Sequence, residues 1–321
     1  SLVQPVSFQP EQALESAFYI GDNWKLNDKL EVNGGLRLNI YSFLGPKTVY
    51  EYQEGAPLSL ETIVDTSDYK SLENIATYTG LDYRLGAKYM INDEFSLKAG
   101  ISSLHQYIFL LSNTIAVSPT DMWKLCDNHT KPLMGTQYSV GVYKNFLGNM
   151  FEVSAEAYYK KVKNLVEFKD GAELTAIEKP ETEVLQAKLD AYGIEFMLRK
   201  KFGKISGWFN YTYSKSTIIA KDDERGESIN QGKAYPANYD KPHAVNLVLN
   251  YRINRRMSFS TNFVYSTGRP VTYPTSIFYL NGIPITNFSL RNEYRLPDYY
   301  RLDLSLNVEG NLKLNKLAHG S

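Results

Sequence analysis

The feature that most constrains this chain is a pair of alternating runs within Tyr239–Pro274, joined by the short polar turn Ile253-Asn254-Arg255-Arg256. The apolar face of each run recurs at every second residue: Val245, Leu247, Leu249 and Tyr251 in the first, and Phe259, Thr261, Phe263 and Tyr265 in the second. Side chains alternate across a strand, so each run has one apolar and one polar face. Each run is about ten residues long, which suffices for a tilted strand to cross a bilayer. A soluble hairpin has the same pattern, so the choice between a soluble and a membrane hairpin depends on the rest of the chain.

The same two-strand unit recurs along the chain. The paired runs are 18–26 with 30–41, 81–90 with 95–104, 137–146 with 151–159, and 192–202 with 205–213, and a further unit begins at 300–308. Long connections separate the units and cover 43–80, 107–135, 163–189, 217–240 and 270–297. The pattern predicts about eleven strands joined alternately by short turns and long loops.

This alternation of connections indicates a membrane barrel. Structureless loops of about twenty or more residues are uncommon in a compact soluble domain. Outer-membrane barrels have short turns toward the periplasm and long loops toward the outside. We therefore predict an all-β fold, a transmembrane antiparallel β-barrel. The alternative is a soluble carbohydrate-binding or enzymatic all-β domain, which would fractionate without detergent.

The polar faces of the runs carry charges of both signs. On a membrane strand the apolar set must face lipid, because a charge near the midplane costs several kcal/mol there. The residues predicted to face the lumen or a plug are Arg37, Arg84, Lys88, Lys98, Glu152, Glu156, Glu195, Arg199, Arg252, Arg301 and Asp303. A wall of mixed sign suits a lumen filled by another polar domain better than a selective ion pore.

Composition narrows the function classes. The 321 residues contain 35 Lys+Arg and 35 Asp+Glu, so no net charge draws the chain to nucleic acid. One cysteine, Cys126, and four scattered histidines give no metal-ligand spacing. No nucleophile elbow, P-loop or dinucleotide fingerprint is present. We therefore expect no enzyme activity, no cofactor and no metal site.

Aromatic residues are the candidates for ligand contact. The chain has 25 Tyr, 15 Phe and 3 Trp, and such rings favour sites with one apolar and one wet side. The candidates in the loops and upper lumen are Trp123, Tyr235, Tyr239, Tyr273 and Tyr279. For each of them the alternative is a place in an interfacial girdle or in loop packing.

Several short motifs together resemble the C-terminal half of TonB-dependent outer-membrane receptors, especially those of Bacteroidota. The motifs are DKPH at 240–243, YSTGRP at 265–270, YGIEF at 192–196, YTYSKS at 211–216, RLPDYYRLDLSL at 295–306, GLRLNIY at 35–41 and EAYYKKVKNL at 156–165. Each alone is weak, but their order and spacing cover nearly the whole chain. His243, which lies in the first motif, is interpreted as a residue of the outer rim.

The resemblance implies a barrel of about 22 strands whose lumen is plugged by an N-terminal domain. Strand directions then place residues 1–321 in the C-terminal half, at about strands ten to twenty, with Leu317–Ser321 starting the twenty-first. We expect the plug, the first strands and the last strands to belong to the parent protein or to a companion chain, because a half-barrel has bare edges.

The function that the resemblance implies is TonB-energised uptake of a nutrient across the bacterial outer membrane. The expected partners are outer-membrane lipids, the plug and remaining strands, and the TonB–ExbB–ExbD system. A surface lipoprotein could dock through the loops at 43–80 and 270–297. A non-transporting scaffold barrel and, less favoured, a passive porin remain alternatives, and the substrate stays open.

Overall fold

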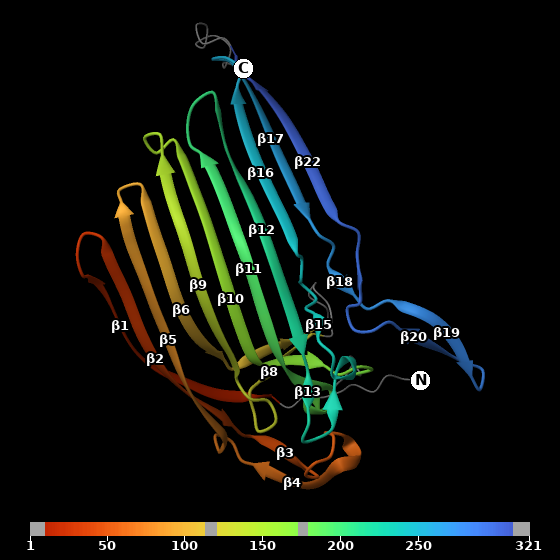
Figure 1. Ribbon diagram of the computed structural model, residues 1–321. Helices are drawn as coiled ribbons and strands as arrows, with labels where there is room; N and C mark the ends of the chain where they lie inside the picture. The colour runs from red at the N-terminus through yellow and green to blue at the C-terminus, as the bar shows by residue number, and fades with distance from the viewer. Residues whose placement is uncertain (1–9, 113–120, 173–178, 311–321) are drawn as a thin grey trace, which may run out of the picture.

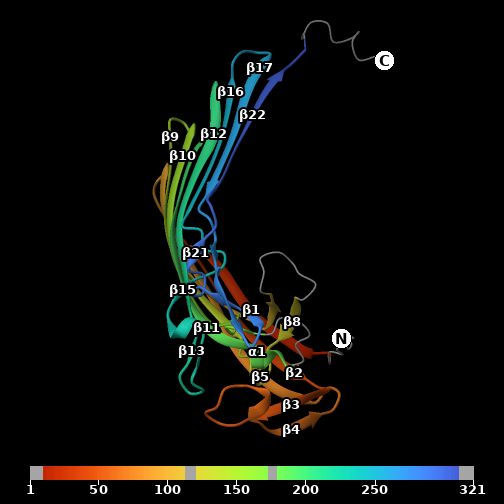
Figure 2. The same cartoon turned by 90° about the vertical axis from the view of Figure 1, so that its right-hand side faces the viewer.

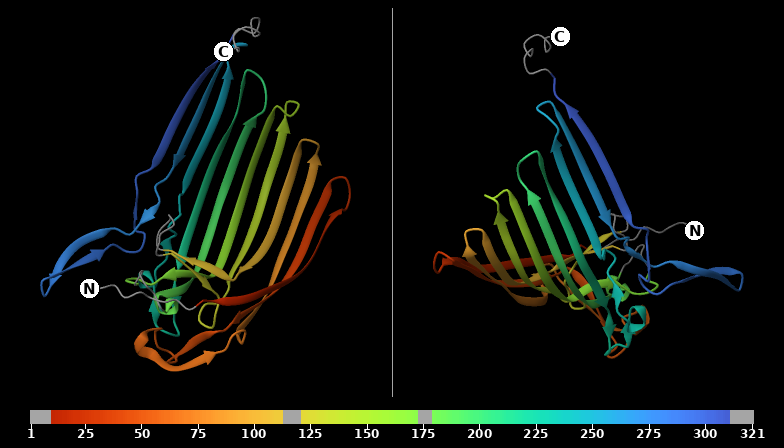
Figure 3. Two further views of the ribbon diagram at one scale, coloured as in Figure 1. Left: turned by 180° about the vertical axis from the view of Figure 1, so that it is seen from behind. Right: turned by 45° about the horizontal axis from the view of Figure 1, so that its top comes forward.

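A single curved antiparallel sheet dominates the computed structural model, which describes residues 10–112, 121–172 and 179–310 (Figures 1 and 3). Eleven of its strands follow one another in chain order: β1 (Gln12–Lys25), β2 (Leu30–Leu44), β5 (Asn74–Asn92), β6 (Phe95–Gln106), β9 (Leu133–Phe146), β10 (Phe151–Phe168), β11 (Val184–Lys200), β12 (Ile205–Ile219), β16 (His243–Arg252), β17 (Met257–Ser266) and β22 (Tyr299–Val308). A short twelfth strand, β15 (Tyr235–Pro236), pairs only with β12. The all-β prediction and its eleven strands are confirmed.

The short turns all lie at one end of the sheet, and the long connections lie at the other (Figure 1). Asparagine side chains build three of the turns. Asn27, Asn92 and Asn254 each accept hydrogen bonds through Oδ1 from the backbone N–H groups two and three residues later. An asparagine that bonds ahead to its own backbone replaces a backbone turn, which explains why these joins close in so few residues.

The long connections are more ordered than the sequence suggested. They contain four small hairpins, formed by β3 (Lys47–Tyr52) with β4 (Ile63–Tyr69), β7 (Ile108–Leu111) with β8 (Met122–Leu125), β13 (Lys221–Asp222) with β14 (Glu227–Ser228), and β19 (Pro274–Leu280) with β20 (Ile283–Phe288). A further short pair, β18 (Pro270–Val271) with β21 (Tyr294–Arg295), flanks the last of these hairpins. Three short helical turns complete them: η1 (Leu60–Thr62), α1 (Pro180–Glu183) and η2 (Asn230–Gly232). Local pairing satisfies backbone groups that a structureless loop would leave to water.

Several strands also run further than the predicted units. β5, β10 and β11 contain 19, 18 and 17 residues, whereas a tilted strand needs only about ten to cross a bilayer. The extra residues lie at the end with the long connections, where β10 has a bulge between Val162 and Leu165. These strands are therefore longer than a bilayer crossing requires, and their extra length supports a layer of loops.

The curvature gives the sheet two different faces (Figure 2). The side chains that the alternation assigned to lipid are exposed or partly exposed, and in β22 Leu302, Leu304 and Leu306 are 59%, 62% and 57% accessible. The opposite, concave face carries the polar set and the inward-folded loops. Within the described residues, no helix is both long and apolar enough to cross a membrane. The predicted start of a strand at Leu317–Ser321 lies outside the described residues.

Candidate functional site

The concave face brings the predicted lumen residues together. Cross-strand registers place Lys88 opposite Lys98, and Glu156 opposite both Gly141 and Glu195. The same ladders place all eleven predicted residues on this one face. That these residues face a plug stays a prediction.

Four of these residues line one hollow of about 510 Å³ on the concave face: Arg84, Lys88, Lys98 and Glu156. The Lys98 ammonium lies 4.2 Å from the centre of the Tyr143 ring. Gly86, Gly100 and Gly141 line the hollow, and because glycine has no side chain they leave its floor open. The middle of the sheet therefore offers a charged, recessed surface to whatever fills the lumen.

The other predicted lumen residues form separate local pairs. Glu152 lies 3.7 Å from Arg199, and its second oxygen pairs with Lys201. Arg301 pairs with Asp303 two residues later on the same face at 2.9 Å. Of the remaining three residues, Arg37 contacts Glu15 at 3.4 Å, Arg252 lines a small hollow beside the turns, and Glu195 lies opposite Glu156. Several of the charges on the wall are therefore paired with an opposite charge on the same face.

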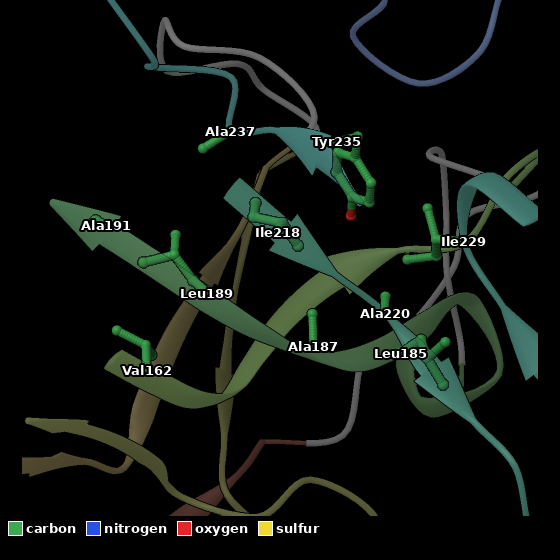
Figure 4. Close-up of a cluster of buried hydrophobic side chains, with 10 residues drawn as sticks. All are labelled: Val162, Leu185, Ala187, Leu189, Ala191, Ile218, Ala220, Ile229, Tyr235 and Ala237. Carbon is green, nitrogen blue, oxygen red and sulfur yellow. The ribbon is translucent and has the colours of Figure 1, made fainter. Parts of the chain in front are cut away.

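Toward the long connections the concave face changes from polar to apolar. Leu185, Ala187, Leu189 and Ala191 continue the same face of β11 that carries Glu195, and all four are buried. Side chains of the connection between β12 and β16 cover them, including Ile229, Tyr235 and Ala237 (Figure 4). A second apolar cluster joins Tyr41 and Phe43 of β2 to the β7–β8 hairpin. The loops therefore fold inward and close part of the lumen.

A buried ion cluster fastens the β7–β8 hairpin to the start of β1. Lys124 is 2% exposed, and its Nζ donates to Glu11 Oε1 at 2.9 Å and to the carboxylate of Asp127. Glu11 also accepts from the backbone N–H of Leu125 at 2.8 Å and from Lys47 at 3.2 Å. Burial opposes the charge of Lys124, but the two carboxylates raise its pKa above the ordinary value. Sequence reasoning missed this cluster, because its parts lie far apart in the chain.

Residues of the motifs that were assigned to the outer rim form one hydrogen-bonded cluster, which we call the rim lock. The Arg295 guanidinium pairs with the carboxylate of Asp240 and donates to the carbonyls of Asp240, at 2.9 Å, and Gly268, at 3.1 Å. Asp240 is 3% exposed and also accepts from the N–H of Ser216 at 2.7 Å. The N–H of Gly268 donates to Asp298 at 2.9 Å. Four separate sequence motifs thus hold together the ends of β12, β16, β17 and β22.

Replacing Arg295 by methionine is expected to destabilise this rim by about 1.5–3 kcal/mol, because the buried Asp240 carboxylate loses its charged donor. The measurement is urea unfolding of the intact receptor in lipid vesicles. The control is Arg301→Met, which breaks an exposed ion pair with Asp303 and should change the stability little. Equal losses in the two variants would contradict the structural role of the lock.

The aromatic candidates are not gathered at one place. Tyr235 is 2% exposed and belongs to the apolar cluster under the loops, with its hydroxyl unpaired among the described residues. Trp123 (66%), Tyr239 (59%), Tyr273 (59%) and Tyr279 (72%) are accessible and lie on three connections, with Tyr273 and Tyr279 both between β17 and β22. Their contact with a ligand stays a prediction.

The histidines and the cysteine make local contacts. His105 Nδ1 lies 2.6 Å from Asp82 on the concave face, and His243 Nδ1 lies 2.9 Å from the Tyr211 hydroxyl at the outer rim. Burial, aided by the neighbouring Asp127 carboxylate, raises the pKa of the Cys126 thiol to about 12. Across the described residues, no group of three or more His, Cys, Asp or Glu is arranged to hold a metal ion.

A second cavity, of about 540 Å³, lies where the inward-folded loops meet. Its wall combines the ends of β7 and β10 with residues of β18 and of the segment after β20. Three of the lining side chains carry positive charge: Lys169, Arg269 and Arg291. This site was absent from the sequence reasoning. The only sequence signal is the placement of basic residues beside the strand ends.

Comparison with known proteins identifies the fold and the family. The family described as "TonB dependent receptor-like, beta-barrel" matches residues 3–316. Solved structures with the same fold include the ferripyoverdine receptor of Pseudomonas aeruginosa, with 14% identity, TM-score 0.55 and coverage of 92% of this chain and 32% of that one. The FrpB iron transporter of Neisseria meningitidis has 11% identity, TM-score 0.58 and coverage of 95% and 38%. The copper transporter OprC has 12% identity, TM-score 0.54 and coverage of 93% and 40%.

No curated protein sequence matches the chain significantly. The chain spans between 32% and 40% of the length of these three solved structures. The family match, in contrast, extends over nearly every residue and agrees with the curved sheet, the short turns and the inward-folded loops. The chain therefore belongs to the TonB-dependent receptor-like β-barrel family, a family of the outer membrane.

Proposed function

We propose that this chain forms the C-terminal half of the barrel of a receptor that imports a nutrient across the outer membrane with energy from TonB. The observation that carries the proposal is the family match over residues 3–316. The mixed-charge concave wall supports it, because such a wall suits a lumen occupied by a polar plug. The family and the fold are those of receptors and transporters.

The proposed partners follow from the open geometry of the half-barrel. Among the described residues, β1 and β22 each have one neighbour in the sheet, so their outer edges would pair with the remaining strands of the barrel. The plug would lie against the concave face and would be rearranged by the TonB–ExbB–ExbD system. Outer-membrane lipids would surround the convex face, where Leu302 and Leu304 are exposed.

A surface lipoprotein is the proposed protein partner at the outer end. The two loops predicted to receive it contain the β3–β4 and β19–β20 hairpins. The second hairpin projects away from the sheet and exposes Ile277, Tyr279 and Ile283 (Figure 3). Exposed apolar side chains of this kind suit a protein contact.

The test is substrate uptake by cells that carry the intact receptor, measured with and without functional TonB. The panel should include iron chelates and copper, which are named for the proteins of similar fold. We expect accumulation of at least one substrate that is lost when TonB is deleted. Uptake that persists without TonB, with ion conduction in planar bilayers, would favour a porin. A stable set of protein partners without any uptake would favour a scaffold.

A further inference from the structure

The cavity beneath the loops contains one arginine whose charge is not balanced by any of the described residues. The side chain of Arg269 lines the cavity, and among the described residues it makes neither an ion pair nor a hydrogen bond. Its backbone is fixed, because its carbonyl accepts from the N–H of Leu296 at 3.0 Å. Gly268 before it and Pro270 after it are both buried. The guanidinium is therefore held at the cavity without a protein partner.

The other two basic side chains of the cavity are already engaged. Arg291 lies 3.6 Å from Glu167 and 3.3 Å from Asp170, and it donates to the carbonyl of Phe168 at 3.1 Å. Lys169 pairs with the carboxylate of Glu227. The Asp240 carboxylate pairs with Arg295 in the rim lock.

The acidic side chains around the cavity do not pair with Arg269, so the positive charge of Arg269 stays uncompensated within the described residues. Glu167 is the acidic side chain of the lining, and burial raises its pKa above the ordinary value, while Arg291 acts in the opposite direction. Asp170, in contrast, is half exposed and therefore well hydrated. Among the described residues, Arg269 is therefore the basic side chain of the lining that has no ion-pair partner.

The cavity also has an apolar side. Phe168 and Phe288 line it, together with Leu110 of the β7–β8 hairpin. Trp123 is the direct cross-strand neighbour of Leu110, so the two side chains share one face of the hairpin. Both remain accessible, at 66% and 43%. Apolar walls with a few fixed polar groups are the usual composition of a small-molecule site.

We propose that this cavity binds a small organic anion whose carboxylate pairs with Arg269 and whose apolar ring lies against Leu110 and Phe288. A guanidinium matches a carboxylate in two parallel hydrogen bonds, which gives both affinity and orientation. The proposal rests on the proposed uptake function, since it assigns a class of ligand to the same receptor. It concerns binding alone and requires no transport step.

The test uses two fluorine-labelled probes and ligand-observed ¹⁹F NMR on the purified intact receptor. The probes are 4-fluorobenzoate and the neutral, nearly isosteric 4-fluorobenzamide. The wild-type receptor should bind the benzoate about tenfold more tightly, because only the benzoate forms the charge-assisted pair. Arg269→Gln should remove this preference, and Arg269→Lys should keep part of it. Because the Arg269 side chain makes no hydrogen bond or ion pair among the described residues, its replacement breaks no such interaction there.

The matched control is Arg255→Gln, which removes an exposed arginine in the turn at the opposite end of the sheet and should leave the preference unchanged. The proposal is overturned if the wild-type receptor binds neither probe, binds both equally, or keeps its preference in Arg269→Gln. TonB is absent from this measurement. A preserved benzoate preference together with TonB-independent uptake would therefore contradict the proposed function and leave the anion site standing.

Discussion

Replacing Lys124 by methionine is expected to loosen the inward-folded β7–β8 hairpin by about 3–5 kcal/mol, because the buried Asp127 carboxylate would lose its cation. Glu11, which is less buried, would keep its contacts with Lys47 and with the N–H of Leu125. Methionine nearly matches the length of the lysine side chain, so packing against Phe43 is largely kept and the electrostatic loss is isolated.

Limited proteolysis of the intact, detergent-solubilised receptor measures this effect. Cleavage within the connection between β6 and β9 tracks the population of its open form, which should rise on the order of a hundredfold to a thousandfold. Lys233→Met, which removes an exposed loop lysine, should leave cleavage unchanged. Unaltered cleavage in Lys124→Met would show that the ion cluster does not stabilise the hairpin.

The ion cluster also predicts a pH dependence. Burial acts against the ionised form of Asp127, but the Lys124 cation holds the pKa of this carboxyl below its ordinary value of 3.8. A lowered pKa in the folded state means that the contribution of Asp127 is fully present above that value and is lost as the pH falls below it. Cleavage of the wild-type connection should therefore increase in acid.

An arginine placed at Ile194 is expected to destabilise the barrel by about 2–4 kcal/mol, whereas an arginine at the adjacent Glu195 should cost little. Ile194 is 55% exposed on the convex face, where the charge would meet hydrocarbon. Glu195 lies on the concave face directly opposite Glu156, so Glu195→Arg would replace a like-charge pair by an opposite-charge pair.

Urea unfolding of the intact receptor in lipid vesicles compares Ile194→Arg with Glu195→Arg under the same conditions. Because the two positions are neighbours on one strand, depth in the membrane and strand propensity are nearly matched. A larger loss for Glu195→Arg would mean that the two faces of the sheet are exchanged. Equal losses of stability in the two variants would contradict the assignment of one face to lipid and the other to the lumen.

The strand order was predictable because it depends on local rules. Side-chain alternation assigns faces, and asparagine-rich joins such as the one at Asn27 close hairpins between neighbours in the chain. Antiparallel neighbours then follow in sequence without any long-range choice. The family resemblance could be recognised for the same reason, because its motifs are short local patterns within strands and at strand ends.

The loop layer was not predictable in this way. Tyr235 was a candidate for ligand contact, yet it is 2% exposed under its own connection. Nothing in the sequence around it distinguishes a ring that packs beneath a loop from a ring that faces solvent. The segments that hold the connections together also pair residues more than a hundred positions apart, such as Glu11 with Lys124.

The sequence by itself determined the class of fold, the number of strands in this part of the barrel, and which side chains share each face. These properties follow from a period of two residues and from turns of a few residues, which are local. Only the tertiary structure decided how the long connections fold inward, that Arg295 closes the rim on Asp240, and that Arg269 has no counter-charge among the described residues. Those features depend on contacts between distant segments, and the burial and charge balance that result exist only once the sheet has brought the segments together.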